Sequence, residues 1–130
     1  YSNERGIYAT GYNASPEFPY LGANFWKPWE KECTAEFLEG GDGFAIDCGI
    51  RIFGAYSRAD AKKSFQLKVR DMYGQSELVY PVFDELDTVK SFKAMVLRSG
   101  SQDYLHAMLR DEFLTSLLKA HSEILYVQAY

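Results

Sequence analysis

The sequence predicts an α+β fold, an antiparallel sheet of about five strands with one long amphipathic helix packed on it. A glycine-rich stretch at 40–43 separates two runs of alternating apolar residues, which is typical of a β-hairpin. Apolar and polar residues alternate over 63–70, which indicates a half-exposed strand. Apolar residues recur at helical spacing over 102–121, and this pattern predicts the helix.

The chain has 130 residues, 47% hydrophobic and 25% charged, which is the size and composition of one globular domain. Its net charge of −4 argues against nucleic acid as a partner, because a phosphate backbone attracts basic surfaces. No apolar run approaches the roughly 20 residues of a spanning helix, so we expect no membrane span.

Residues 1–32 contain three of the four prolines and show little periodicity, so we expect an extended, aromatic-rich lead-in. Aromatic side chains suit half-buried sheets and carbohydrate platforms alike. Packing is the favoured interpretation of these rings. The alternative is a sugar-binding surface that uses exposed Trp26 and Trp29.

The predicted hairpin contains two cysteines, one on each strand. Cys33 shares its parity with the apolar residues of the first strand, and Cys48 with those of the second. A two-residue turn at Gly40-Gly41 pairs Cys33 with Cys48, close enough for a disulfide if the pair is of the non-hydrogen-bonded type. A longer turn shifts the register and leaves two buried thiols, and the sequence favours this second alternative.

Further elements follow along the chain. We expect a turn at 72–76, a strand at 77–80, one helical turn at 84–89 and a more fully buried strand at 92–97. The run at 123–130 is typical of a strand, and the chain ends within it. We therefore expect a single partial domain over 1–130, truncated at its C-terminus, with the lead-in over 1–32 and the sheet and helix over 33–130. Exposed strand edges in such a domain favour a homodimer.

Several short segments, in their order and spacing, resemble the spore-coat protein H (CotH) kinase-like family. They are Gly-Ile-Arg-Ile-Phe-Gly at 49–54, Ser-Arg at 57–58, Lys-Ser-Phe-Gln-Leu at 63–67, Tyr-Pro-Val-Phe at 80–83, Phe-Lys-Ala-Met-Val-Leu-Arg at 92–98 and Leu-Arg-Asp-Glu-Phe at 109–113. The segments at 6–8 and 29–31 also look like the start of that family's domain. The resemblance covers nearly the whole chain, and its motifs are specific jointly rather than singly.

The resemblance implies a secreted, cell-surface or spore-coat protein kinase that uses ATP and a divalent metal, Mg or Mn, to phosphorylate serine on coat or surface proteins. This chain would form the nucleotide-side sheet with its helix. The family's metal-binding and catalytic acidic residues are expected beyond Tyr130, so the fragment alone is expected to be inactive and to retain no nucleotide. A non-catalytic extracellular adhesion or carbohydrate-binding module is the alternative function.

The residues that could contact nucleotide phosphates are Lys63, Arg51, Arg58 and Ser57. Lys63 has the parity of the apolar residues in its strand, so its ammonium group should either reach solvent or meet an anion. Arg51 alternates with Ile50 and Ile52 and so faces away from their side of its own strand. Ser57 and Arg58 lie in the loop directly before the Lys63 strand. Arginine can hold phosphate oxygens with two hydrogen bonds, but ordinary solvated ion pairs are an equally good interpretation of these residues.

The predicted helix carries Arg110, Asp111 and Glu112 off its apolar stripe. In kinases a helix carboxylate orients the strand lysine, and Asp111 or Glu112 could do so here. A solvated helix face is the favoured alternative. No group of His, Cys, Asp or Glu has the spacing of a metal site.

Overall fold

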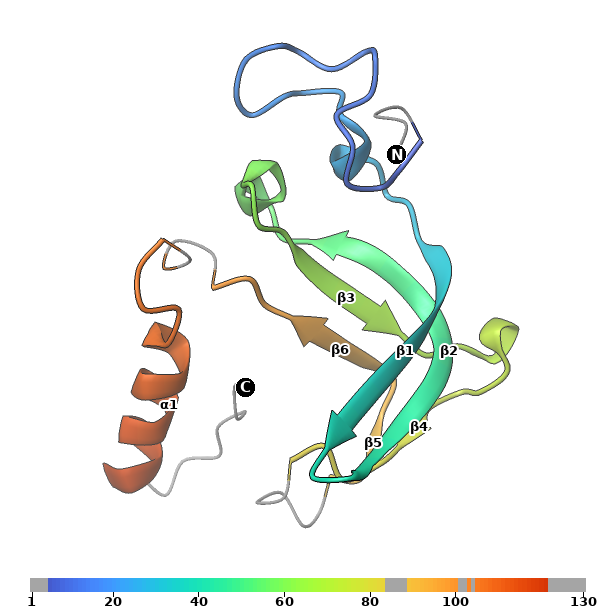
Figure 1. Ribbon diagram of the computed structural model, residues 1–130, viewed down its shortest axis with the longest axis vertical. Coiled ribbons are helices and arrows are strands. Elements are labelled where there is room, and N and C mark those ends of the chain that lie inside the picture. The colour runs from blue at the N-terminus through green and yellow to red at the C-terminus, as the bar shows by residue number, and fades with distance from the viewer. Residues whose placement is uncertain (1–4, 84–88, 101–102, 104, 122–130) are drawn as a thin grey trace.

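The computed structural model describes residues 5–83, 89–100, 103 and 105–121 (Figure 1). A four-stranded antiparallel sheet has the order β1-β2-β3-β6, and a two-stranded sheet pairs β4 with β5. The strands are β1 (Lys31–Glu39), β2 (Asp42–Phe53), β3 (Ser64–Lys68), β4 (Leu78–Val79), β5 (Ser91–Phe92) and β6 (Ala94–Leu97). The helical elements are η1 (Asn24–Trp26), η2 (Tyr56–Ala59), η3 (Asp71–Tyr73) and α1 (Arg110–His121). The α+β class and the antiparallel sheet are confirmed, but the described residues form sheets of four and two strands rather than the single sheet of about five that the sequence predicts.

The β1–β2 hairpin closes with a two-residue turn. Gly40 and Gly41 have φ angles of 57° and 94°, and positive values at both positions are the pattern of a type I′ turn. Glu39 pairs with Asp42, so the shorter of the two alternative turns is the one that forms. Its register places Cys33 directly opposite Cys48.

The lead-in packs onto one face of the sheet. Phe25 of η1 is buried in a cluster with Ile52 of β2 and Ala59 of η2. A second cluster joins Ile46 of β2 with Val69 and Leu78. Figure 1 shows the lead-in at the same end of the sheet as η2. The lead-in thus packs on the sheet through Phe25, and it includes a short 3-10 turn.

The expected helix over 102–121 is shorter than predicted and does not cover the sheet. It begins at Arg110, and Met108 just before it has a φ of 58°, which interrupts a right-handed helix. Its apolar side chains and those just before it are 47–75% exposed: Leu105, Met108, Leu109, Phe113, Leu114, Leu117 and Leu118. Figure 1 shows α1 standing apart from the sheet. The prediction of a helix packed on the sheet is therefore wrong.

The segment expected as one buried strand at 92–97 divides into β5 and β6. Among the strands of the described residues β6 pairs with β3 alone, and its residues Val96 and Leu97 are exposed. The strand expected at 77–80 is the short β4. The terminal strand expected at 123–130 lies outside the described residues, as does the helical turn expected at 84–89 except for Val89.

Glu30 connects the end of the lead-in to the loop after β3. Its carboxylate forms an ion pair with Arg70, Nε to Oε1 at 2.9 Å, and accepts a hydrogen bond from the Tyr73 hydroxyl at 3.1 Å. The side chain lies against Gly49 in the middle of β2. A Cβ at Gly49 would lie 2.5 Å from Glu30 Oε1 and 2.7 Å from its Cγ, so this contact requires glycine.

We predict that Gly49→Ala lowers the free energy of unfolding by about 1–3 kcal/mol, because the new methyl group must displace Glu30. Urea denaturation of both proteins measures the change. Glu30→Ala is the matched background, since it removes the carboxylate that the methyl group meets. In the Glu30→Ala variant, Gly49→Ala should lower the free energy of unfolding much less than in the natural chain. An equal loss in both proteins would contradict this interpretation.

Candidate functional site

Lys63 is buried where the lead-in meets the sheet. Its exposed fraction is 7%. Nζ lies 4.0 Å from the centroid of the Phe25 ring and 4.6 Å from that of Tyr8. Nζ also donates a hydrogen bond to the backbone oxygen of Asp60 at 2.8 Å. Among the described residues, no carboxylate lies within ion-pair distance of this ammonium group.

Burial dominates the electrostatics of Lys63. Desolvation lowers its pKa below the ordinary value of 10.5, and the negative charge of Asp60 offsets only part of this effect. The two ring faces attract the cation through their quadrupoles. An ammonium group has three N–H donors, and a single hydrogen bond engages one of them. The group therefore retains the capacity to bind an anion.

Each of the two rings is held by its own packing contacts. Phe25 belongs to the Ile52 cluster beneath the start of β3. The Tyr8 ring stacks on Phe65 of β3 with centroids 6.3 Å apart, and its hydroxyl donates to the backbone oxygen of Ala61. Tyr8 is partly exposed, so it is the wall of this site that faces solvent. Lys63 thus lies on the apolar side of the sheet, as its parity predicts.

Among the described residues, no hydrogen bond joins Arg51, Ser57 or Arg58 to Lys63. Arg51 pairs with Gln66 in the sheet, whereas Ile52 pairs with Phe65, so Arg51 lies on the face opposite the Lys63 site. Arg58 Nε donates to the backbone oxygen of Gly54 at 2.6 Å and so closes the η2 turn that also contains Ser57.

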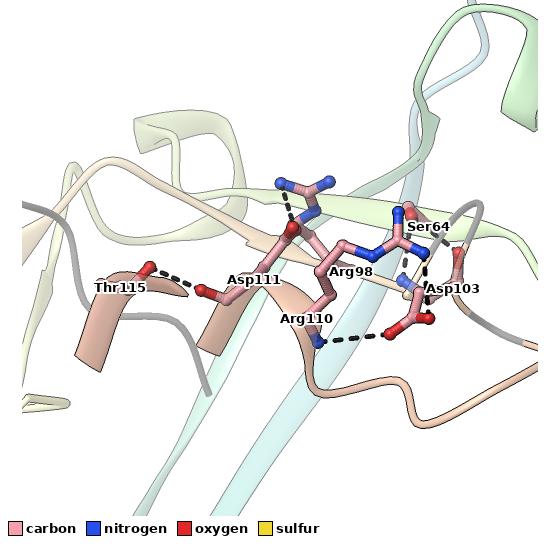
Figure 2. A network of polar contacts seen from close by, with 7 residues as sticks. Ser64, Arg98, Asp103, Arg110, Asp111 and Thr115 are labelled. Carbon is pink, nitrogen blue, oxygen red and sulfur yellow. Dashed lines mark hydrogen bonds and ion pairs between the residues drawn. The ribbon is translucent and has the colours of Figure 1, made fainter. Parts of the chain in front are cut away.

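The helix residues form a separate polar network (Figure 2). Asp111 makes an ion pair with Arg98 at 2.9 Å. Arg110 donates its backbone N–H and a guanidinium N–H to the two carboxylate oxygens of Asp103, each at 3.2 Å. Glu112 is exposed. The predicted role of a helix carboxylate in orienting Lys63 has no support in these contacts, because Asp111 is paired with Arg98.

This network explains why α1 begins where it does. Asp103 is buried and accepts from the first residue of the helix, as a capping carboxylate does. Beside it, Ser64 Oγ accepts a hydrogen bond from the backbone N–H of Ser99 at 3.0 Å. Polar contacts at the end of β6, rather than apolar packing, hold the start of the helix.

Cys33 and Cys48 carry free thiols whose sulfur atoms lie 3.6 Å apart. Cys48 is fully buried at 0% exposure, whereas Cys33 is half-buried on β1. Burial, with the adjacent Cys33 thiol, raises the pKa of the Cys48 thiol to about 12. Cys48 is therefore protonated at neutral pH.

The two tryptophans do not form an open platform. The Trp26 indole N–H donates to the backbone oxygen of Pro19 at 2.9 Å, and the ring is half-buried. Trp29 is also half-buried, with the ammonium groups of Lys27 and Lys31 at 4.5 Å and 5.1 Å from its ring centroid.

Sequence reasoning missed the partners of Lys63. It noted the many aromatic residues of the lead-in but assigned none of them to this lysine. Two features of the sequence could have indicated these partners. Lys63 shares the side of the apolar residues in its strand, and the aromatic-rich lead-in must pack against an apolar surface.

Comparisons with protein-family models, curated proteins and solved structures find no significant match to this chain. Within the described ranges, no three His, Cys, Asp or Glu side chains lie together as metal ligands would. The helices of the described part lack the length and apolar character needed to cross a membrane.

We predict that the Nζ of Lys63 titrates below 10.5 in the folded chain, because the buried charge is desolvated. The unfolded chain then binds the extra proton over the interval between the folded pKa and 10.5. The free energy of unfolding of the natural chain should therefore rise with pH in that interval, relative to Lys63→Met. NMR titration of the Lys63 side chain measures the pKa. A value at or above 10.5 contradicts the prediction.

Proposed function

We propose that this chain is the N-terminal portion of a CotH-like protein kinase, and that Lys63 binds phosphate oxygens of ATP. The observation that carries the proposal is the environment of Lys63: a buried ammonium group with two aromatic faces, one backbone acceptor and no carboxylate partner among the described residues. Such a group is stabilised by an anion, since the anion replaces the hydration that burial removes.

Phosphoryl transfer gives this lysine a specific task. The negative charge of the triphosphate must be matched by cations held in position, and in protein kinases one of them is a lysine on a sheet strand. Lys63 leads into β3, and its aromatic neighbours restrict its position. An incoming phosphate would reach Nζ by displacing the ring of Tyr8, the solvent-facing wall of the site.

The proposal includes a divalent metal, Mg or Mn, and serine on coat or surface proteins as the acceptor. The metal would neutralise phosphate charge and orient the transferring group. The described residues offer no carboxylate cluster for it, so we assign it no ligand here. Secretion, or attachment to a cell surface or spore coat, follows from the same proposal.

An exposed aromatic patch favours a second candidate function, binding of carbohydrate. Phe18 and Tyr56 are 57% and 68% exposed, and their ring centroids lie 6.3 Å apart. The Trp26 ring supports Tyr56 from one side at 6.3 Å. Exposed rings of this kind bind the apolar faces of sugars. The patch replaces the two tryptophans as the candidate sugar platform.

We predict that ATP or inorganic triphosphate, added to the 130-residue chain at millimolar concentration, shifts the NMR signals of Lys63 and raises its pKa. Lys63→Met keeps the length of the side chain and removes the charge, and it should weaken triphosphate binding at least about tenfold, or about 1.4 kcal/mol. Lys62→Met is the matched control, because Lys62 is exposed and its Nζ donates a hydrogen bond to Met108 Sδ at 3.3 Å. Equal triphosphate binding by the natural chain and both variants would contradict the proposal.

Serine phosphorylation by a longer polypeptide containing this chain, lost with Lys63→Met and kept with Lys62→Met, tests the catalytic part of the same proposal. Triphosphate binding without phosphate transfer in that polypeptide would retain the lysine site and reject the kinase.

For the second candidate, we predict that Tyr56→Ala abolishes glycan binding on an array of polysaccharides while leaving the fold intact, because the ring is largely exposed. Tyr12→Ala is the control, since Tyr12 is exposed but makes no ring contact with another described residue. If no glycan binds the natural chain, the carbohydrate function is rejected.

A further inference from the structure

The β1–β2 hairpin holds two thiols in contact at one register position. Cys33 and Cys48 are directly opposed, with their sulfur atoms 3.6 Å apart. Neither the proposed phosphate site nor the aromatic patch uses them. A pair of thiols at van der Waals distance differs from a chance pair of buried cysteines, because a small side-chain movement is enough to bond them.

The backbone separation at this position also suits a disulfide. Glu39 and Asp42 close the two-residue turn as a hydrogen-bonded pair, and every second pair along the hairpin repeats that type. Cys33 and Cys48 therefore also form a hydrogen-bonded pair, with an expected Cα separation of about 5.5 Å, and not the non-hydrogen-bonded pair on which the sequence prediction of a disulfide depends. Disulfides span Cα separations of about 4.4–6.8 Å, so the strands need not move apart or together.

The hydrogen-bonded type of pair sets the character of the bond. Its side chains diverge more than those of a non-hydrogen-bonded pair, so a disulfide here carries strain. Strained disulfides are reduced more readily than relaxed ones, and they are typical of reversible sites. This geometry therefore favours a reversible disulfide over a permanent structural one.

The two cysteines differ in how an external reagent can reach them. Cys33 is half-buried on β1, which pairs with β2 alone among the strands of the described residues. Cys48 is fully buried on the central strand β2, and its thiol is protonated at neutral pH because burial raises its pKa. Cys33 is the more exposed of the two thiols, so an external disulfide reaches it first.

We propose that Cys33 and Cys48 form a reversible dithiol–disulfide site that is oxidised by exchange with an external disulfide, with Cys33 reacting first and Cys48 completing the bond. The Cys33 thiolate attacks one sulfur of the external disulfide, forms a mixed disulfide and releases one thiolate. Cys48 then loses its proton and its sulfur attacks Cys33 Sγ, which releases the second thiolate. The two cysteines supply two electrons, and the external disulfide is reduced to two thiols.

Oxidised glutathione is the probe for the test. The folded natural chain, incubated with it at mildly alkaline pH, should lose the mass of two hydrogen atoms. Cys48→Ser should accumulate one glutathione on Cys33, because no second thiol completes the exchange. Cys33→Ser is the matched variant and should react at least about tenfold more slowly, since its remaining thiol is buried.

Peptide mapping of the natural chain at short times keeps the test independent of the variants' folding. It should find glutathione on Cys33 before the internal bond appears, and unfolding in urea should abolish this order. Reduced glutathione at millimolar concentration should regenerate both thiols. The proposal is overturned if the folded chain keeps two free thiols, if glutathione appears first on Cys48, or if the internal bond resists reduced glutathione.

Discussion

The register of the β1–β2 hairpin is the constraint on which the other features of this structure depend. Two glycines with positive φ close the turn, and every later pairing of β1 with β2 follows from that closure. The register places Cys33 against Cys48. It also fixes which residues of β2 face the lead-in, because a slip of one position would turn Ile52 away and Arg51 toward it. β3 pairs with the same β2 in a register of its own, which places Phe65 opposite Ile52, and Lys63 just before β3 lies over Phe25 of the Ile52 cluster.

The charge on Lys63 depends on a balance between solvation and its neighbours. Each aromatic face contributes about 0.5–2 kcal/mol of cation–π attraction, and the hydrogen bond to Asp60 adds to this. Desolvation opposes both, and the lowered pKa means that desolvation exceeds the attraction of the Asp60 charge. A lysine in this state gains more from an anion than a solvated surface lysine does, because less water competes for its ammonium group.

The sequence could predict local features well and the arrangement of distant segments poorly. Alternation over 63–70 is a property of neighbouring residues, and it correctly predicted the side of the sheet on which Lys63 lies. The hairpin turn is an exception among the local features, because the sequence favours a longer turn and Gly40 and Gly41 form the two-residue one. The helix illustrates the limit, because apolar spacing indicates which face of a helix is apolar but not what that face contacts. Its start depends on Met108 in a left-handed conformation and on capping by Asp103, and neither follows from periodicity.

The separation of Lys63 from the helix changes what nucleotide binding would require here. In a kinase-like sheet a helix carboxylate pairs with the lysine and holds it in place. In this chain Asp111 is paired with Arg98 at the end of β6, and two aromatic rings restrict the lysine instead. A carboxylate partner competes with phosphate for the same ammonium group, whereas aromatic faces leave its hydrogen-bond donors to the ligand. Phosphate binding at Lys63 would then be limited by displacement of Tyr8, so a smaller side chain at that position should admit the anion more readily while stabilising the cation less.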